Sequence, residues 1–296
     1  MVADGNSARP VLKVKFWGSR GSIATPGPKT LRYGGNTACV EVRYRNSLVV
    51  FDCGTGIREL GNSLEREFNG TPIHVHLFVS HTHWDHIQGF PFFQPAYDST
   101  NVITIYGLFS ADRTLEKALR EQMESTFFPL PMDHLKSRIE FVEFTRAVEI
   151  DGATITTKRL NHPGLASAFR IDVDGKSVVY MTDHEPYCSL FGDTVENRER
   201  EQELTDFARG ADIYIREAQY NSEEYAAHRG WGHGTFEHAL EAARDAGVAN
   251  LVIYHHDPMH DDDCLDRLYA ECQAKATAMK LSSRIVFAAD NAELSA

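Results

Sequence analysis

The chain has 296 residues, of which 42% are hydrophobic and 24% are charged. This composition is typical of soluble globular proteins and excludes disordered, fibrous and membrane-embedded classes. Lys and Arg number 30 against 42 Asp and Glu, which gives a formal net charge of −12. A surface this acidic repels nucleic-acid backbones, so we expect no long nucleic acid as a partner.

Hydropathy and cysteine usage predict a cytoplasmic protein with no membrane contact. The longest apolar runs, such as 48–51 and 251–254, are far shorter than the roughly 20 residues of a membrane-spanning helix. Residues 1–10 lack the charged segment and apolar stretch of a secretory signal. The five cysteines are widely spaced and form no CxxC pair, as expected for reduced thiols.

Strand patterns dominate the first half of the chain. Residues 11–17 alternate between apolar and polar side chains and end in a glycine-rich turn at 18–22. Residues 56–68 carry apolar side chains at helical spacing, which predicts a helix lying on a sheet. The expected elements of this half are strands at 11–17, 38–44, 47–52, 73–80 and 102–106, and helices at 56–68 and 111–126.

The second half repeats this arrangement, with strands first and helices after them. Two such halves predict an α/β protein in which two sheets pack face to face with helices outside, an αββα four-layer sandwich. No linker interrupts the sequence, so we expect a single domain over 1–296. The expected elements are strands at 138–144, 153–160, 168–173, 177–181, 211–215, 251–254 and 283–288, and helices at 199–209, 235–246 and 261–279.

A dense group of metal-ligand residue types follows the strand at 73–80. His81 and His83 are two positions apart, so both side chains point to the same side and can share one metal ion. Asp85 and His86 lie just beyond and offer an oxygen and a nitrogen to a second cation. The alternative interpretation is a surface histidine cluster that alternates by chance.

Three further ligand types each follow a predicted strand: His162, Asp183 and His255. Strand ends at one edge of a sandwich converge in space, so these residues can complete two metal sites with Asp183 as the bridge. Each residue taken alone fits a structural role equally well. His256 is a rival to His255, which we prefer because it comes first after the apolar strand.

The segment His81-Thr-His-Trp-Asp-His86 resembles the HxHxDH signature of the metallo-β-lactamase superfamily. The resemblance implies the superfamily's αββα fold and two divalent metal ions, with zinc expected and manganese or iron as alternatives. It implies that one ion is held by His81, His83 and His162, that the other is held by Asp85, His86 and His255, and that Asp183 bridges them.

Within that superfamily the chain resembles the branch of ribonuclease Z and small phosphodiesterases. The resemblance rests on the turn at 18–22, the acidic strand end at 212–217 and the segment 232–237. It implies that His233 aids phosphate chemistry and that Glu217 orients His233, with Asp85 as the third member of the catalytic set. Gly234 stands where ribonuclease Z has serine, and His233 and Glu217 also fit a helix cap and a salt bridge.

A small phosphodiester is the expected substrate, with cAMP or cGMP as the specific hypothesis. Only 20 residues separate His162 from Asp183, which leaves no room for the tRNA-binding arm of ribonuclease Z. Two divalent cations, two carboxylates and a hydroxide sum to about +1, which attracts an anionic ester, and the cations would lower the pKa of water toward about 7. The alternatives are a nuclease of short RNA or DNA, a lactone or thioester hydrolase, an iron-based redox sensor and a metal-free interaction module.

Several residues carry weaker hypotheses. Asp52 is expected to orient a metal-binding histidine, and His184 to reach the substrate. Core packing is the favoured role of Trp84 and residues 90–93, with the wall of a site for a base or an apolar substrate group as the alternative, and the apolar loop 127–131 is expected to overhang a site. Apolar segments such as 247–254 fit a core or the face of a homodimer equally well.

Overall fold

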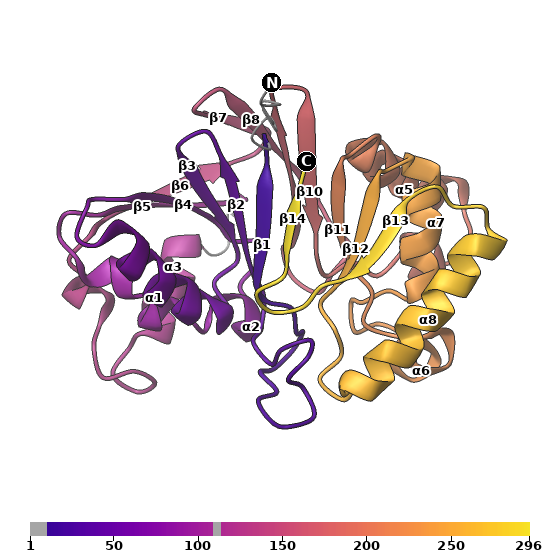
Figure 1. The fold of residues 1–296 in the computed structure, drawn as a ribbon, viewed down its shortest axis with the longest axis horizontal. Coiled ribbons are helices and arrows are strands. Elements are labelled where there is room, and N and C mark those ends of the chain that lie inside the picture. Colours follow the sequence, from indigo (N-terminus) through magenta and orange to yellow (C-terminus); the bar gives the residue numbers. More distant parts are fainter. Residues whose placement is uncertain (1–10, 109–113) are drawn as a thin grey trace, which may run out of the picture.

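Two seven-stranded β-sheets pack face to face in the computed structural model of the chain, which describes residues 11–108 and 114–296 (Figure 1). The first sheet has the order β14 (Glu293–Ser295), β1 (Lys13–Gly18), β2 (Cys39–Tyr44), β3 (Ser47–Phe51), β4 (His74–Phe78), β5 (Val102–Leu108) and β6 (Arg138–Phe144). The second has the order β13 (Arg284–Phe287), β12 (Asn250–Tyr254), β11 (Ile213–Glu217), β10 (Lys176–Met181), β9 (Ser167–Val173), β8 (Ala153–Arg159) and β7 (Ala147–Ile150).

Helices cover the outer face of each sheet, which confirms the predicted αββα sandwich (Figure 1). The helices on the first sheet are α1 (Gly56–Phe68) and α3 (Leu115–Gln122), and those on the second are α5 (Val195–Ala208), α7 (Phe236–Ala246) and α8 (Asp262–Ala278). The shorter elements are α2 (Trp84–Ile87), α4 (Tyr187–Phe191) and α6 (Ser222–His228), with 3₁₀ turns η1 (Phe90–Phe92), η2 (Gln94–Tyr97) and η3 (Met132–His134).

Strand β3 shows why the central strands are apolar on both faces. Phe51 points between the sheets, where its ring stacks on Phe169 at 5.7 Å and on Tyr180 at 5.0 Å between centroids. Its neighbour Val50 points outward and joins the cluster that contains Leu60 of α1. A strand buried on both faces reads as a continuous hydrophobic run, as residues 48–51 do.

The predicted elements agree with the structure best where the periodic pattern is long. The helix over 56–68 has the predicted bounds, whereas the helix expected over 111–126 is confirmed only for Leu115–Gln122, and residues 111–113 lie outside the described residues. The helix expected at 199–209 begins earlier, because the Thr194 side chain accepts a hydrogen bond from the backbone N–H of Asn197 and caps it.

The elements missed by the sequence pattern are short. Strand β14 has three residues and pairs antiparallel with β1, so the end of the chain returns to the first sheet. Strand β7 has four residues, and α2, α4 and α6 have four to seven. None of these is long enough to display a helical or strand period.

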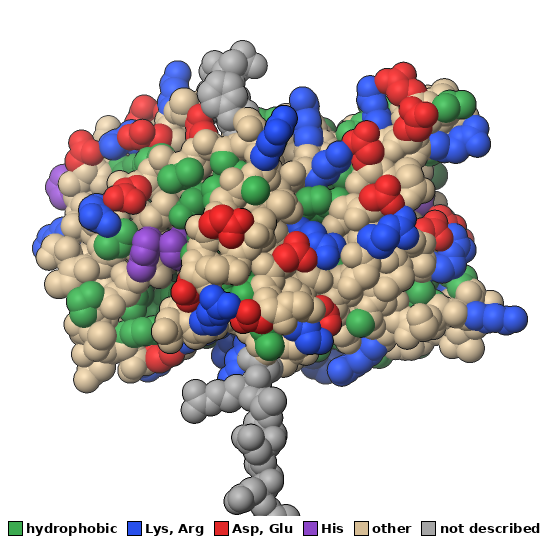
Figure 2. All heavy atoms as spheres, turned by 90° about the horizontal axis from the view of Figure 1, so that it is seen from above, with side chains coloured by type: hydrophobic (Ala, Val, Ile, Leu, Met, Phe, Trp, Pro, Cys, Tyr) green, Lys and Arg blue, Asp and Glu red, His purple; other side chains and the backbone are tan. Residues whose placement is uncertain are grey.

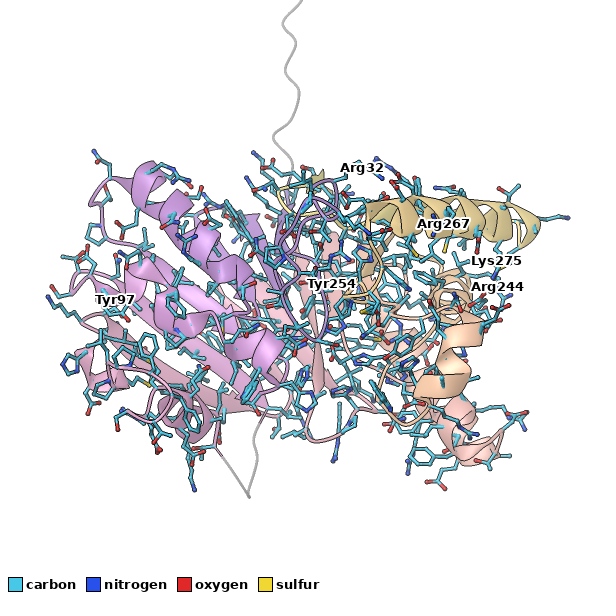
Figure 3. The ribbon with its side chains drawn as sticks, turned by 90° about the horizontal axis from the view of Figure 1, so that it is seen from below. Arg32, Tyr97, Arg244, Tyr254, Arg267 and Lys275 are labelled. Carbon is cyan, nitrogen blue, oxygen red and sulfur yellow. The ribbon has the colours of Figure 1, made fainter. Side chains whose placement is uncertain are left out.

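A long loop, residues 19–37, connects β1 to β2 in the first sheet and contacts α8 on the second. The guanidinium of Arg32 donates to Asp263 at 2.8 Å and to Asp266 at 2.6 Å, both at the start of α8 (Figure 3). The Asp261 side chain caps the same helix by accepting from the N–H of Cys264. The acidic cluster at 261–263 therefore has a structural role, as a helix cap and as an anchor for the loop.

The described part of the chain contains no helix with the length and apolar character needed to span a bilayer. On the face shown in Figure 2, the side chains of Lys and Arg alternate with those of Asp and Glu. A continuous basic stripe, which is the usual electrostatic footprint of a nucleic-acid-binding protein, does not cross that face.

Candidate metal centre

The carboxyl ends of strands from both sheets meet at the candidate site. Strands β3 and β4 run parallel in one sheet, and β10, β11 and β12 run parallel in the other. Asp52, Asp183 and His255 follow β3, β10 and β12, and their φ angles are +60°, +29° and +60°. Left-handed backbone at three non-glycine residues costs about 1 kcal/mol or more each, and such strain is typical of functional sites.

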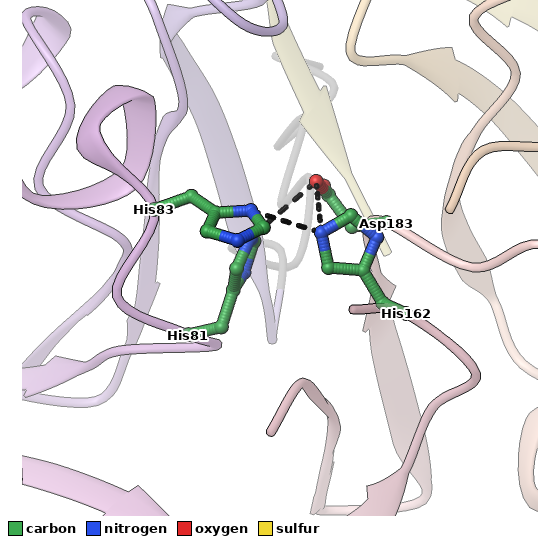
Figure 4. A group of neighbouring side chains, drawn as sticks. All are labelled: His81, His83, His162 and Asp183. Carbon is green, nitrogen blue, oxygen red and sulfur yellow. Dashed lines mark hydrogen bonds and ion pairs between the residues drawn. The ribbon is translucent and has the colours of Figure 1, made fainter. Parts of the chain in front are cut away.

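One group of donor atoms combines His81, His83, His162 and Asp183, whose donors lie within 4.8 Å of one another (Figure 4). The His83 Nδ1 atom lies 3.0 Å from His162 Nε2. The Asp183 Oδ2 atom lies 3.5 Å from His81 Nε2 and 3.6 Å from His162 Nε2. We call these four residues the outer group, because His83 is exposed to solvent.

A second group combines Asp85, His86 and His255, all of which are buried. The Asp85 Oδ2 atom lies 3.2 Å from His86 Nε2 and 3.1 Å from His255 Nε2. The other oxygen of Asp183, Oδ1, lies 3.4 Å from His86 Nε2 and 3.3 Å from His255 Nε2. We call these three residues the inner group. Asp183 thus presents one oxygen to each group.

The donor spacing fits two divalent cations. A tetrahedral ion with ligand bonds of about 2.0–2.1 Å has donors about 3.3 Å apart, close to the 3.0–3.6 Å found here. The buried His81 Nε2 has no hydrogen-bond partner among the described residues, and His86 Nε2 faces His255 Nε2 at 3.2 Å. Mixed imidazole and carboxylate donors suit zinc, manganese or iron. The seven residues expected from the sequence therefore lie together, and their role as ligands stays a prediction.

The second ring nitrogen of three of these histidines is held by a neighbour. The Nδ1 atom of His86 lies 2.7 Å from Asp52 Oδ2, that of His162 lies 2.9 Å from the Gly232 carbonyl, and that of His81 lies 3.0 Å from Ser80 Oγ. Such contacts fix the tautomer and leave Nε2 free to bind a metal. Asp52 therefore occupies the orienting position expected from the sequence.

Two glycines make room for the histidine rings. A Cβ atom at Gly21 would lie 2.4 Å from His255 Nδ1, and one at Gly232 would lie 2.2 Å from His162 Nδ1. Gly232 also has a φ of +93°, which favours glycine. Both positions exclude a side chain for reasons that the sequence alone does not show.

His233 lies beside both groups and shares a donor cluster with Asp183 and His255. Its Nδ1 atom is 3.9 Å from Asp183 Oδ2 and 3.8 Å from Glu217 Oε2. Glu217 ends β11, and its Oε1 accepts a hydrogen bond of 2.7 Å from the N–H of Gly234. Burial lowers the pKa of His233 to about 3 and raises the pKa of Glu217 to about 7.

Two other histidines lie outside the centre. The His184 Nδ1 atom accepts from the N–H of Asn161 and its Nε2 faces Glu201 at 3.3 Å, so the expectation that it reaches substrate is wrong. The His256 Nε2 atom lies 2.8 Å from the carbonyl of Ala288, whereas the neighbouring His255 belongs to the inner group. Strand β12 ends at Tyr254, and His255 has a left-handed backbone with a φ of +60°. The rings of His255 and His256 therefore point in different directions.

The sequence did not reveal three residues that support the centre. The backbone N–H of Ser22 donates to Asp85 Oδ2 at 2.7 Å, and the Tyr180 hydroxyl donates to Asp52 Oδ2 at 2.7 Å. Glu185 accepts from the N–H groups of Gly230 and Gly232 at 2.9 and 3.0 Å, which fixes the loop that carries His233. Only the position of Glu185, two residues after Asp183, could have drawn attention to it.

Comparison with known proteins agrees with this geometry. The family model of the β-lactamase superfamily domain matches residues 48–256. Ribonuclease BN from Cronobacter sakazakii is 26% identical over 277 residues, which cover 80% of this chain and 88% of that protein. The metallo-β-lactamase fold protein YhfI from Bacillus subtilis superposes with a TM-score of 0.66 at 18% identity, covering 96% of this chain and 99% of YhfI.

Human short-form tRNase Z superposes with a TM-score of 0.62 at 17% identity, covering 96% of this chain and 98% of that one. At these identities the solved structures establish the fold, while the family model covers most of the chain. The chain therefore belongs to the metallo-β-lactamase superfamily of hydrolases, in its ribonuclease Z-like branch.

Proposed function

We propose that the protein is a binuclear metal-dependent phosphodiesterase that cleaves a small phosphodiester, with a cyclic nucleotide such as cAMP or cGMP as the specific candidate. The observation that carries the proposal is Asp183, whose two oxygens face two separate groups of donors at 3.3–3.6 Å. When bound there, two divalent cations would activate water and stabilise negative charge on the phosphoryl oxygens.

The proposed ligands are the seven residues of the outer and inner groups. In this proposal zinc is the expected metal, with manganese or iron as alternatives that suit the same donors. The proposed ligands are His81, His83, His162 and Asp183 in the outer group, and Asp85, His86 and His255 in the inner group.

His233 is the proposed catalytic side chain. Its Nδ1 has no hydrogen-bond partner among the described residues, so it is available to a phosphate oxygen. Glu217 is the proposed positioning residue, because its carboxylate lies 3.8 Å from His233 and is fixed by the N–H of Gly234. Asp85 is the third proposed catalytic residue. The N–H of Ser22 donates to its Oδ2, which faces His86 and His255.

A small substrate is favoured over a long nucleic acid by charge and by chain length. The net charge is −12, which opposes the polyanionic backbone of tRNA. The connection between His162 and Asp183 is filled by β9 and β10 and their tight turn, so no binding arm projects from it. The five cysteines are unpaired, in keeping with a cytoplasmic location.

A nuclease of short RNA or DNA is the second candidate function. It is favoured by the 26% identity to ribonuclease BN over most of both chains. Both candidates cleave phosphodiesters and would use the same groups of side chains, so substrate trials must separate them.

The test is hydrolysis by metal-reconstituted protein of 3′,5′-cAMP, bis(p-nitrophenyl) phosphate, a short single-stranded RNA and a simple lactone. Turnover of cAMP and the aryl diester, with slow or absent cleavage of RNA, is the expected result. Preferential cleavage of RNA would favour the nuclease, and cleavage of the lactone alone would overturn the phosphodiester assignment.

A further inference from the structure

A cavity of about 450 Å³ lies between α2, η1, α3 and the loop after α3. Two of its lining residues, Thr82 and Trp84, alternate in the chain with His81, His83 and Asp85. The short segment 81–86, which carries four of the seven proposed ligands, therefore also contributes to this cavity. The size of the cavity falls within the usual range for small-molecule sites.

Large aromatic side chains line this cavity and stay exposed. The exposed fraction is 76% for Trp84, 53% for Phe92 and 72% for Phe127. In contrast, Phe90 and Phe93 are fully buried in the core. The expected core role is therefore confirmed for Phe90 and Phe93 and wrong for Trp84 and Phe92, which line the cavity.

The arrangement of these rings suits a flat aromatic group. Phe92 and Phe128 meet edge to face, with ring centroids 5.4 Å apart and planes at 83°. Aromatic faces in an open cavity bind nucleobases by stacking, without a need for base-specific hydrogen bonds. Ile87 and Pro91 complete the apolar lining.

One polar group in the lining is unusual. The Nε2 atom of Gln122 is buried, and no hydrogen-bond partner for it exists among the described residues. A buried donor without a partner costs free energy unless a ligand or water satisfies it. A ring nitrogen or carbonyl oxygen of a base is an acceptor of the required kind.

We propose that this cavity binds the base of a nucleoside phosphodiester and so determines the substrate class. The proposal rests on the proposed phosphodiesterase function for the phosphate half of the ligand. Trp84, Phe92 and Phe127 would stack on the base, and the Gln122 side chain would turn so that its amide donates to it.

The test compares two esters that share a leaving group, thymidine 5′-(p-nitrophenyl phosphate) and methyl p-nitrophenyl phosphate. In both, the retained ester is a primary alkyl group, so the ratio of kcat/KM values reports binding of the nucleoside. The wild-type ratio is expected to be about tenfold or more. Trp84→Ala and Phe127→Ala are expected to bring it within about twofold of unity, with the methyl ester little affected.

Phe191→Ala is the matched control, because Phe191 is 59% exposed in α4 and is not one of the described residues lining the cavity. It should keep the wild-type ratio, and thermal midpoints should show that all variants fold. A wild-type ratio near unity, an unchanged ratio in both cavity variants, or an equal loss for both esters would overturn the assignment.

A binding measurement separates failure of this inference from failure of the proposed function. Calorimetry with metal-loaded protein would compare thymidine 5′-monophosphate with methyl phosphate. A preference of about tenfold that Trp84→Ala removes supports the cavity even if neither ester is hydrolysed, in which case the phosphodiesterase proposal is wrong. Equal affinities in the wild type overturn the cavity assignment whatever the activity.

Discussion

The outer and inner groups of the candidate metal centre use similar side chains but differ in their exposure to solvent. Histidines of both groups are held from behind, as His86 is by Asp52 at 2.7 Å and His162 by the Gly232 carbonyl at 2.9 Å, but only in the inner group is each side chain buried. The outer group includes His83, which faces solvent and is followed in the chain by Trp84 of the aromatic cavity. The inner group is therefore closed to solvent, whereas the outer group is open to it at His83.

This difference assigns separate tasks to the two groups. Buried ligands exchange a metal slowly, because the shell around a site controls the access of solvent to it. An exposed ligand lets substrate approach and lets an ion exchange. We therefore expect the inner group to hold its ion longer and the outer group to receive the phosphate.

Replacement of Asp183 should have the largest effect, because Asp183 is the residue that joins the two groups. Asp183→Ala deletes both oxygens that join the groups, so we expect fewer than two metals per chain and a fall in kcat/KM of at least about 10³-fold. Elemental analysis and hydrolysis of bis(p-nitrophenyl) phosphate measure both. The control is Asp193→Ala, since Asp193 is exposed and pairs with Arg198 at the surface. Unchanged metal content in Asp183→Ala would contradict the bridging role.

Replacement of His233 should separate chemistry from metal binding. General acid–base groups contribute about 10²- to 10⁴-fold, so His233→Ala should lower kcat by about 10²-fold while two metals remain bound. Glu217→Gln should give a smaller loss, because Glu217 acts through His233. His228→Ala, which alters a histidine at the end of α6, serves as the control. Loss of metal in His233→Ala would show instead that His233 is a ligand.

Weakening the contact behind His86 should lower the metal affinity of the inner group. Asp52→Asn removes the negative charge and one of the two acceptor oxygens behind His86 with little change in volume, and loss of such a partner usually costs about 10- to 100-fold in metal affinity. Tyr180→Phe, which removes one donor to Asp52, should have a smaller effect. Competition with a fluorescent zinc chelator gives the affinities. If Asp52→Asn binds both ions with the affinity of the wild type, the contact between Asp52 and His86 has no role in metal binding.

The smallest expected effect concerns the rate of metal removal, which should proceed in two phases. Because His83 is exposed and the inner ligands are buried, a chelator should take one ion at least about tenfold faster than the other. Stopped-flow release with a colorimetric chelator measures the two rates. A single phase that releases both ions together would mean that the two groups are equivalent.

The contiguous half of the centre could be predicted from sequence, whereas the dispersed half needed an argument about topology. His81 to His86 are neighbours in the chain, so their side chains lie close together whatever the rest of the fold. His162, Asp183 and His255 became candidates because each follows a predicted strand. Their convergence depends on two sheets packing face to face, which the order of strands and helices predicted and the structure confirms.

The supporting contacts could not be predicted. Ser22 lies 63 positions from Asp85 and acts through its backbone N–H, so its side-chain identity carries no signal. Tyr180 lies 128 positions from Asp52 and looks like any apolar strand residue. Short elements such as β14 are set by a pairing partner and carry no period of their own.

The most direct test of a two-metal centre is a zinc titration of metal-stripped protein, in which bound zinc and hydrolysis of bis(p-nitrophenyl) phosphate are followed together. Two ions per chain are expected, with most of the activity appearing as the second ion binds to the outer group. Saturation at one ion, or activity that does not depend on added metal, would contradict the account.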